Sequence, residues 1–70
     1  MRYAIVIEQA LGNFSAYVPD LPGCVATGAT FAEVETEIRD AIAFHLDGMK
    51  EDGIQPPAPS SRVDYIEIAA

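Results

Sequence analysis

The spacing of hydrophobic and polar positions divides the chain into strand-like and helix-like stretches. Residues 3–8 are mostly apolar on both alternating faces, which is typical of a strand covered on both sides and therefore central in a sheet. Residues 14–18 alternate apolar and polar positions, and a turn at Gly12 before them predicts a hairpin. A third short strand is expected at residues 24–28, after a Pro-Gly type II turn at residues 21–24.

A helical period follows these strands. Thr30 begins a capping-box pattern, and apolar residues then recur every three or four positions to about Asp52. Gly53 stands where a helix C-terminal glycine is expected. A proline-rich connector occupies residues 55–61, and residues 62–68 have the pattern of a last strand. The apolar positions of the predicted helix are Phe31, Val34, Ile38, Ala41, Ile42, Leu46 and Met49.

The element order β-β-β-α-β predicts a single α+β domain over residues 1–70. If the first three strands form a meander, a right-handed crossover through the helix places the last strand beside the first. The expected fold is one long helix on a four-stranded mixed sheet with strand order 3-2-1-4. Because the helix covers only one face, the other face would expose side chains such as Val6 or Ile66. We therefore expect a homo-oligomer, a dimer or tetramer, in which another copy covers that face.

Composition supports association and narrows the choice of partner. A 70-residue domain buries only about 60% of its unfolded surface and is marginal by itself. The single cysteine, Cys24, cannot close an internal disulfide, and one Cys with one His cannot supply a four-ligand zinc site. The formal net charge of −7 repels phosphate backbones. We therefore expect a basic protein as partner and no direct binding of nucleic acid.

The sequence also indicates where in the cell the protein is expected. The first three residues lead directly into a strand-like segment rather than a signal peptide. No run of about 18 apolar residues indicates a membrane helix. A cytoplasmic protein with no membrane partner is the simplest expectation.

The stretch SAYVPDLPGC at residues 15–24, followed by TGAT at residues 27–30 and a Glu-rich helix, resembles the HicB antitoxin family over most of the chain. The resemblance implies a partial ribonuclease-H-like or double-stranded-RNA-binding-like fold. It also implies a partner, HicA, which is a small basic toxin that cleaves messenger RNA with a histidine. Members of the family usually carry a C-terminal DNA-binding module. Only residues 62–70 follow the connector here, so repression of an operon by this chain alone is not expected.

Two groups of residues are candidates for contact with a partner. The rigid loop around residues 19–24 would present its tip at low entropic cost, although a Pro-Gly turn also serves topology alone. Acids on the polar face of the helix would attract a basic toxin, although solubility explains the same charges. The candidate partner-binding residues are Tyr17, Asp20, Leu21, Glu33 and Glu37.

Catalytic chemistry is not expected. Cys24 is interpreted as a small buried hydrophobe and His45 as a structural or interface residue. A Mg²⁺-dependent nuclease needs several converging carboxylates, and the available Glu8, Asp64 and Glu67 are scattered along the chain. No catalytic residue, metal or cofactor is therefore expected. The alternative to an antitoxin is an orphan HicB-like oligomeric module that binds another protein or a ligand and has no toxin.

Overall fold

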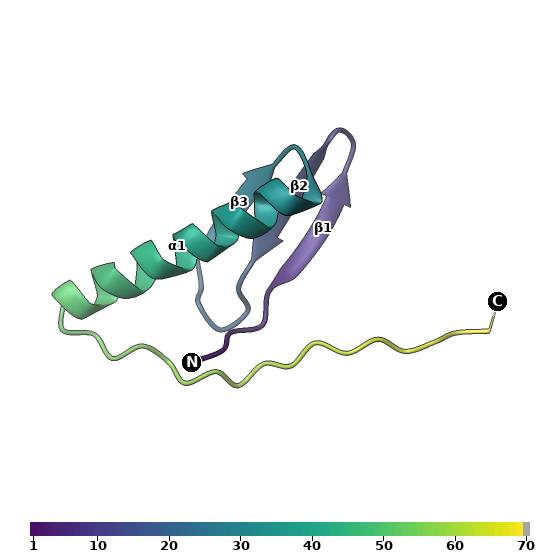
Figure 1. Cartoon of the computed structure of the whole chain (residues 1–70). Helices are drawn as coiled ribbons and strands as arrows, with labels where there is room; N and C mark the ends of the chain where they lie inside the picture. The colour runs from purple at the N-terminus through teal and green to yellow at the C-terminus, as the bar shows by residue number, and fades with distance from the viewer. Residues whose placement is uncertain (70) are drawn as a thin grey trace.

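The computed structural model describes residues 1–69 and contains a three-stranded antiparallel sheet crossed by one long helix (Figure 1). The strands are β1 (Val6–Ala10), β2 (Asn13–Tyr17) and β3 (Val25–Gly28), and the helix is α1 (Phe31–Glu51). The strand order is β1-β2-β3. The helix packs on β3 and β2, and its C-terminal half extends past the sheet (Figure 1).

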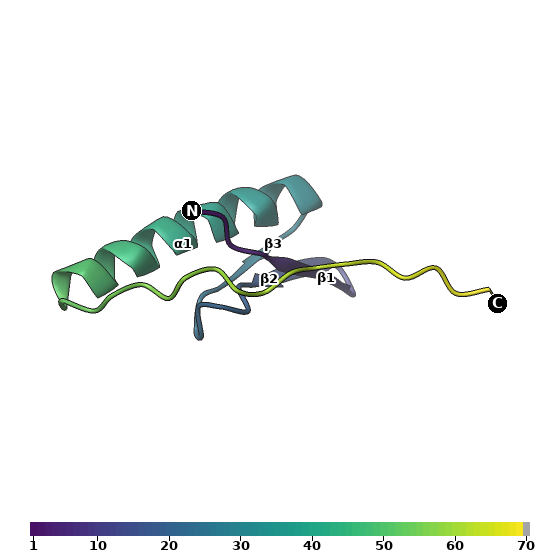
Figure 2. The same cartoon turned by 90° about the horizontal axis from the view of Figure 1, so that it is seen from below.

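The predicted four-stranded sheet of order 3-2-1-4 is wrong. Residues 62–69 are extended but pair with no strand of the described chain, and β1 is an edge strand rather than a central one. An apolar alternating pattern shows that a segment suits a pleated surface, but it does not specify which edge it joins. The chain just before residue 62 is tied to Asp20, and beyond that point it runs away from the sheet (Figures 1 and 2).

The two predicted turns are confirmed. Gly12 has a φ of 72° and Gly23 a φ of 83°, a left-handed backbone conformation that glycine adopts without steric cost. The backbone N–H of Cys24 donates to the carbonyl oxygen of Leu21 at 3.1 Å, which closes the Pro-Gly turn. The turn at Gly12 reverses the chain between β1 and β2, and the turn at Gly23 lies in the loop between β2 and β3.

Both ends of the predicted helix are also confirmed. The hydroxyl oxygen of Thr30 accepts a hydrogen bond of 3.0 Å from the backbone N–H of Glu33. At the other end Gly53 has a φ of 68°, and the N–H of Ile54 donates to the carbonyl oxygen of Met49 at 2.8 Å. This Schellman arrangement satisfies carbonyls that the last turn leaves free.

The buried core lies between α1 and the β2–β3 half of the sheet. The predicted apolar side of the helix faces it, with Val34 and Ile38 fully buried and the later apolar positions half-buried. Phe31 is half exposed, but its ring meets that of Phe14 edge-to-face, with centroids 6.4 Å apart. The buried hydrophobic residues are Ala16, Val18, Leu21, Cys24, Val34 and Ile38.

The helix approaches the sheet most closely at Gly28, the last residue of β3. A Cβ atom built on Gly28 would lie 2.7 Å from the backbone nitrogen and 3.0 Å from the Cα of Val34. Both of these are backbone atoms of α1, which cannot move aside as a flexible side chain does. The absence of a side chain at Gly28 therefore allows the helix to lie directly on the strand.

Gly28→Ala is expected to lower the free energy of unfolding by about 1–3 kcal/mol, because the helix must shift away from β3. Gly48→Ala is the matched control, since a Cβ at Gly48 meets nothing within 4 Å. This control is expected to raise the free energy of unfolding by about 0.5–1 kcal/mol. Urea denaturation of both variants at one protein concentration measures the two changes. A Gly28→Ala protein as stable as the parent contradicts the proposed contact.

Candidate protein-binding surface

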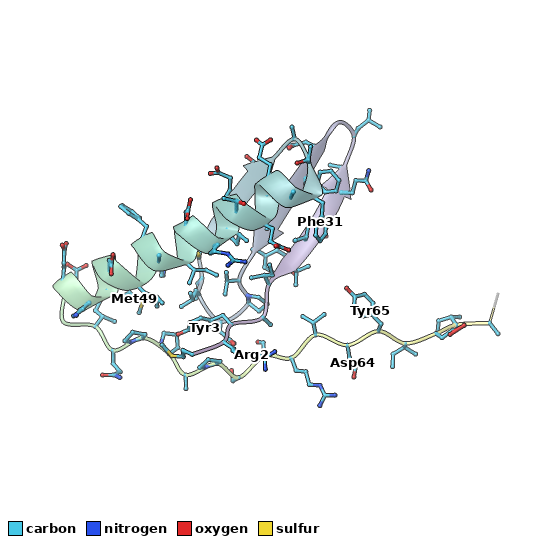
Figure 3. All side chains as sticks on the ribbon, viewed as in Figure 1. Arg2, Tyr3, Phe31, Met49, Asp64 and Tyr65 are labelled. Atoms are coloured by element: carbon cyan, nitrogen blue, oxygen red, sulfur yellow. The ribbon has the colours of Figure 1, made fainter. Side chains whose placement is uncertain are left out.

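The side of α1 that faces away from the sheet carries a row of exposed residues, which we call the acidic stripe. Its members follow one another at alternating intervals of four and three residues, so they lie along one line of the helix. The row spans roughly 27 Å at 1.5 Å per residue. Figure 3 shows oxygen-tipped side chains along the side of the helix opposite to residues 62–69. The acidic stripe consists of Glu33, Glu37, Asp40, Phe44, Asp47 and Glu51.

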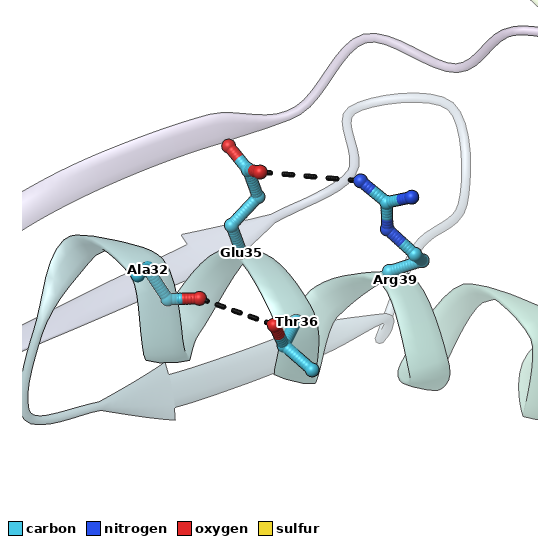
Figure 4. Close-up of polar contacts among 4 residues, drawn as sticks. All are labelled: Ala32, Glu35, Thr36 and Arg39. Carbon is cyan, nitrogen blue, oxygen red and sulfur yellow. Dashed lines mark hydrogen bonds and ion pairs between the residues drawn. The ribbon is translucent and has the colours of Figure 1, made fainter.

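Within residues 1–69, no carboxylate of the acidic stripe forms an ion pair. Arg39 lies beside the stripe and pairs instead with Glu35, with 3.9 Å between Nη2 and Oε1 (Figure 4). Among residues 1–69 the other ion pair joins Arg62 to Asp64, far from the helix in sequence. The stripe is therefore a concentrated negative surface that attracts a basic partner.

Phe44 is the apolar member of the stripe, and the sequence analysis did not single it out. Its side chain is 82% exposed, although a phenylalanine of a single-domain helix is usually turned toward the core. The signal was available, because Phe44 follows Asp40 by four residues and precedes Asp47 by three. An exposed aromatic ring surrounded by carboxylates has the composition of an interface centre.

The five candidate residues occupy three separate places. Glu33 and Glu37 lie together on the acidic stripe. Tyr17 lies on β2 and is 41% exposed on the sheet face opposite to the helix. Leu21 is buried in the core with 1% of its surface exposed. Its side chain therefore anchors the loop to the core and is not presented to a partner. The structure therefore does not bring the loop and the helix acids into one surface.

Asp20, in the same loop, binds the connector that follows the helix. Oδ2 accepts hydrogen bonds from the backbone N–H groups of Ser60 at 2.9 Å and Ser61 at 3.0 Å, and Oδ1 accepts from their hydroxyls at 3.1 and 2.7 Å. The N–H and the hydroxyl of Ser61, followed by the N–H of Ser60, lower the pKa of Asp20 to about 2. The carboxylate thus clamps residues 60 and 61 to the loop.

The open face of the sheet is partly apolar and partly polar. The strand register places Val6, Tyr17 and Val25 side by side across the three strands. The next row on this face consists of Glu8, Ser15 and Thr27. Val6, which was expected to be exposed on this face, is half-buried, whereas Val25 at the other end of its row is exposed.

The residues considered for catalysis or metal binding lie in separate parts of the structure. Burial raises the pKa of the Cys24 thiol, which weakens it as a nucleophile. Glu8 lies on β1, whereas Asp64 and Glu67 lie in the extended segment beyond the connector. Within residues 1–69, no three His, Cys, Asp or Glu side chains form a group that would hold a metal ion. The same residues include no helix that is both long and apolar enough to span a bilayer.

Comparison with known sequences gives a family match over almost the whole chain. The model of the HicB-like antitoxins of bacterial toxin-antitoxin systems matches residues 3–69. An uncharacterized 14.9 kDa protein from the rep-hol intergenic region of Haemophilus phage HP1 is 38% identical over 66 residues, covering 94% of this chain. The chain spans 50% of the length of that phage protein. A UPF0150 protein of Thermoplasma acidophilum is 31% identical over 58 residues, covering 81% of this chain and 84% of the relative.

Comparison with solved structures leads to the same family. A chain from a HicA3 and HicB3 toxin-antitoxin complex superimposes with a TM-score of 0.73 at 32% identity. The match covers 86% of this chain and 70% of that chain. The resemblance inferred from residues 15–30 is therefore confirmed.

The clamp at Asp20 predicts a specific pH dependence. Because the folded pKa is lowered to about 2, the stabilisation it contributes is present above about pH 4 and is lost as the pH falls through about 2. In an NMR titration, the amide resonances of Ser60 and Ser61 are expected to shift with a midpoint near 2. Asp20→Asn is expected to abolish that titration and to speed hydrogen exchange at both amides. Asp40→Asn, the same change on the acidic stripe, is expected to leave both signals unaltered. A midpoint near 4 contradicts the clamp.

Proposed function

The chain belongs to the family of HicB-like antitoxins of bacterial toxin-antitoxin systems, and we propose that it binds and neutralises a small, basic, HicA-like toxin that cleaves messenger RNA. The net charge of −7 supports a basic partner. The similar chain in a HicA3 and HicB3 complex supports a toxin of the HicA kind. In this proposal the chain acts as a ribonuclease inhibitor and catalyses no reaction itself.

The observation that carries the proposal is the acidic stripe with Phe44 at its centre. A toxin that cleaves RNA must bind the RNA phosphates on a basic surface. A line of carboxylates can bind the same basic surface in place of the phosphates. The five acids of the stripe are exposed and lie along one side of α1. The mechanism is exclusion, because RNA and the helix cannot occupy the same basic surface at once.

Phe44 and the acids have different tasks in this interface. Long-range attraction between charges of opposite sign speeds the encounter more than it tightens the complex. A fully desolvated aromatic ring near the centre of an interface contributes most to affinity. We therefore assign steering to Glu33 and Glu37, and anchoring to Phe44, which is 82% exposed in the free chain.

The other candidate residues take part in the proposal less directly. Tyr17 lies on the open face of the sheet, outside the stripe, and is proposed as a further contact for the partner. Asp20 and Leu21 shape the loop and hold the connector. The proposal also includes association of copies into a homo-oligomer, since Val25 and several residues beyond the connector expose large apolar side chains. Direct binding of nucleic acid is not part of it.

Phe44→Ala is expected to weaken binding to a HicA-like protein of the same genome by about 30-fold, because it removes an anchor worth about 2 kcal/mol. Leu11→Ala is the control, since Leu11 is fully exposed on the β1–β2 turn, away from the stripe. It is expected to change the dissociation constant by less than about twofold. Isothermal titration calorimetry with a catalytically inactive toxin measures both. Equal effects of the two variants exclude Phe44 as the anchor, and absence of micromolar binding by the parent chain favours the orphan module.

Glu33→Gln combined with Glu37→Gln is expected to lower the association rate constant about tenfold at low salt and to change the dissociation rate little. The control carries the same charge change at Glu8 and Glu67, outside the stripe, and is expected to have a smaller effect. The difference between the two double variants is expected to vanish near 1 M salt, where the screening length is about 3 Å. Stopped-flow kinetics at two salt concentrations measures it. Equal rates for both variants at low salt contradict steering by the stripe.

A further inference from the structure

Residues 62–69 form an extended segment whose large apolar side chains are not covered by residues 1–61. After the clamp at residues 60 and 61, the chain continues in extended form away from the sheet (Figures 1 and 2). Tyr65 is 91% exposed, Ile66 79% and Ile68 75%. Tyr65 and Asp64 point to opposite sides of the segment, as in a strand (Figure 3). Such a density of exposed large apolar side chains is characteristic of an interface.

The β1 side of the sheet lacks cover as well. In the described chain β1 pairs only with β2, so the N–H and C=O groups of its outer edge are free. The helix packs on β3 and β2, which leaves Ile5 and Ile7 on the β1 side only half-buried. An edge strand with an incompletely covered apolar face is suited to receive one more strand.

The chain's own segment is held off this edge. The hydroxyl of Tyr3 donates to the carbonyl oxygen of Pro57 at 2.6 Å, and Asp20 holds the two serines that follow. Beside these contacts, a hollow of about 400 Å³ separates residues 2–4 from residues 59–63. The connector therefore brings the segment to the β1 side of the molecule, but the segment does not pair with β1.

We infer that two copies of this chain exchange their 62–69 segments, each segment adding as a strand to the free edge of β1 in the other copy. The arrangement differs from the predicted sheet within one chain, because pairing arises only between copies. Each molecule offers one donor segment and one acceptor edge, which is the self-complementarity that a two-fold dimer requires. Eight residues span roughly 26 Å, enough to pair along all five residues of β1.

The composition of residues 62–69 suits a strand that is covered on both faces. Val63 and Tyr65 lie on one of its alternating faces, and Ile66 and Ile68 on the other, so both faces gain from burial. The connector before it is rich in proline, which favours an extended chain over one that folds back. The inference goes beyond toxin binding and is tested on the chain alone, so either can fail without the other.

Light scattering of the full chain at tens of micromolar is expected to give twice the chain mass of 7.5 kDa. Tyr65→Pro and Ile66→Pro are the test variants. Successive N–H groups of a strand point to opposite sides, so one of the two prolines removes a hydrogen bond to β1. At least one variant is expected to give 7.5 kDa with unchanged helical circular dichroism. Ala58→Pro, in the extended connector, is the control and is expected to stay dimeric. A monomeric parent chain, or two dimeric test variants, overturns the inference.

A cross-linking experiment identifies which copy the segment contacts and does not depend on the folding of the proline variants. Tyr65 is replaced by the photoreactive p-benzoylphenylalanine, and equal amounts of ¹⁴N- and ¹⁵N-labelled protein are mixed, unfolded, refolded and irradiated. Mass spectrometry is expected to find mixed-isotope peptide pairs that join residue 65 to residues 2–10. Pairs of a single isotope only would show that the segment closes on its own β1, and cross-links to other surfaces would show a different interface; either result overturns the inference.

Discussion

Because Gly28 has no side chain, the first turn of α1 lies directly against the end of β3, and this close approach determines what the molecule buries. The helix is placed over β2 and β3, where Val34 and Ile38 complete the core. A helix laid on that half of the sheet covers the β1 side less, so that Ile5 and Ile7 are only half-buried. The uncovered edge and the exposed outer side of the helix are thus two consequences of one packing contact, and both are suited to binding other polypeptides.

The loop between β2 and β3 connects the core to the connector. It buries Leu21 and Cys24, and the backbone N–H of Val18 closes it by donating to the carbonyl oxygen of Cys24 at 3.2 Å. With the backbone held in this way, the Asp20 carboxylate is fixed in position to accept four hydrogen bonds from the chain 40 residues later. Within the Pro-Asp-Leu-Pro-Gly-Cys motif, Asp20 therefore anchors the connector outside and the next residue, Leu21, anchors the loop inside.

The parts of the fold that follow from short-range chemistry could be predicted from the sequence, and the parts that need a distant partner could not. The cap at Thr30, the glycine at residue 53 and the helical period depend on residues a few positions apart. Pairing of residues 62–68 depends on which edge is free, which alternation alone does not specify. Helical periodicity likewise sufficed to predict that Glu33 and Glu37 lie on one exposed side of the helix. The burial of Leu21 depends on tertiary packing, which its turn motif does not reveal.

Two copies that each carry a charge of −7 repel one another, so the position of the charges decides whether they can associate. The stripe acids lie on an exposed side of α1, whereas the proposed dimer contact uses the outer edge of β1. Residues 62–69 carry one positive and two negative side chains, and Arg62 already pairs with Asp64. The proposed dimer contact therefore adds little net charge of its own, and salt should favour it by screening the remaining repulsion. Toxin binding through the stripe depends on attraction and should weaken with salt. On these two proposals, opposite responses to salt follow from one charge distribution, because the acidic stripe and the edge of β1 are different surfaces.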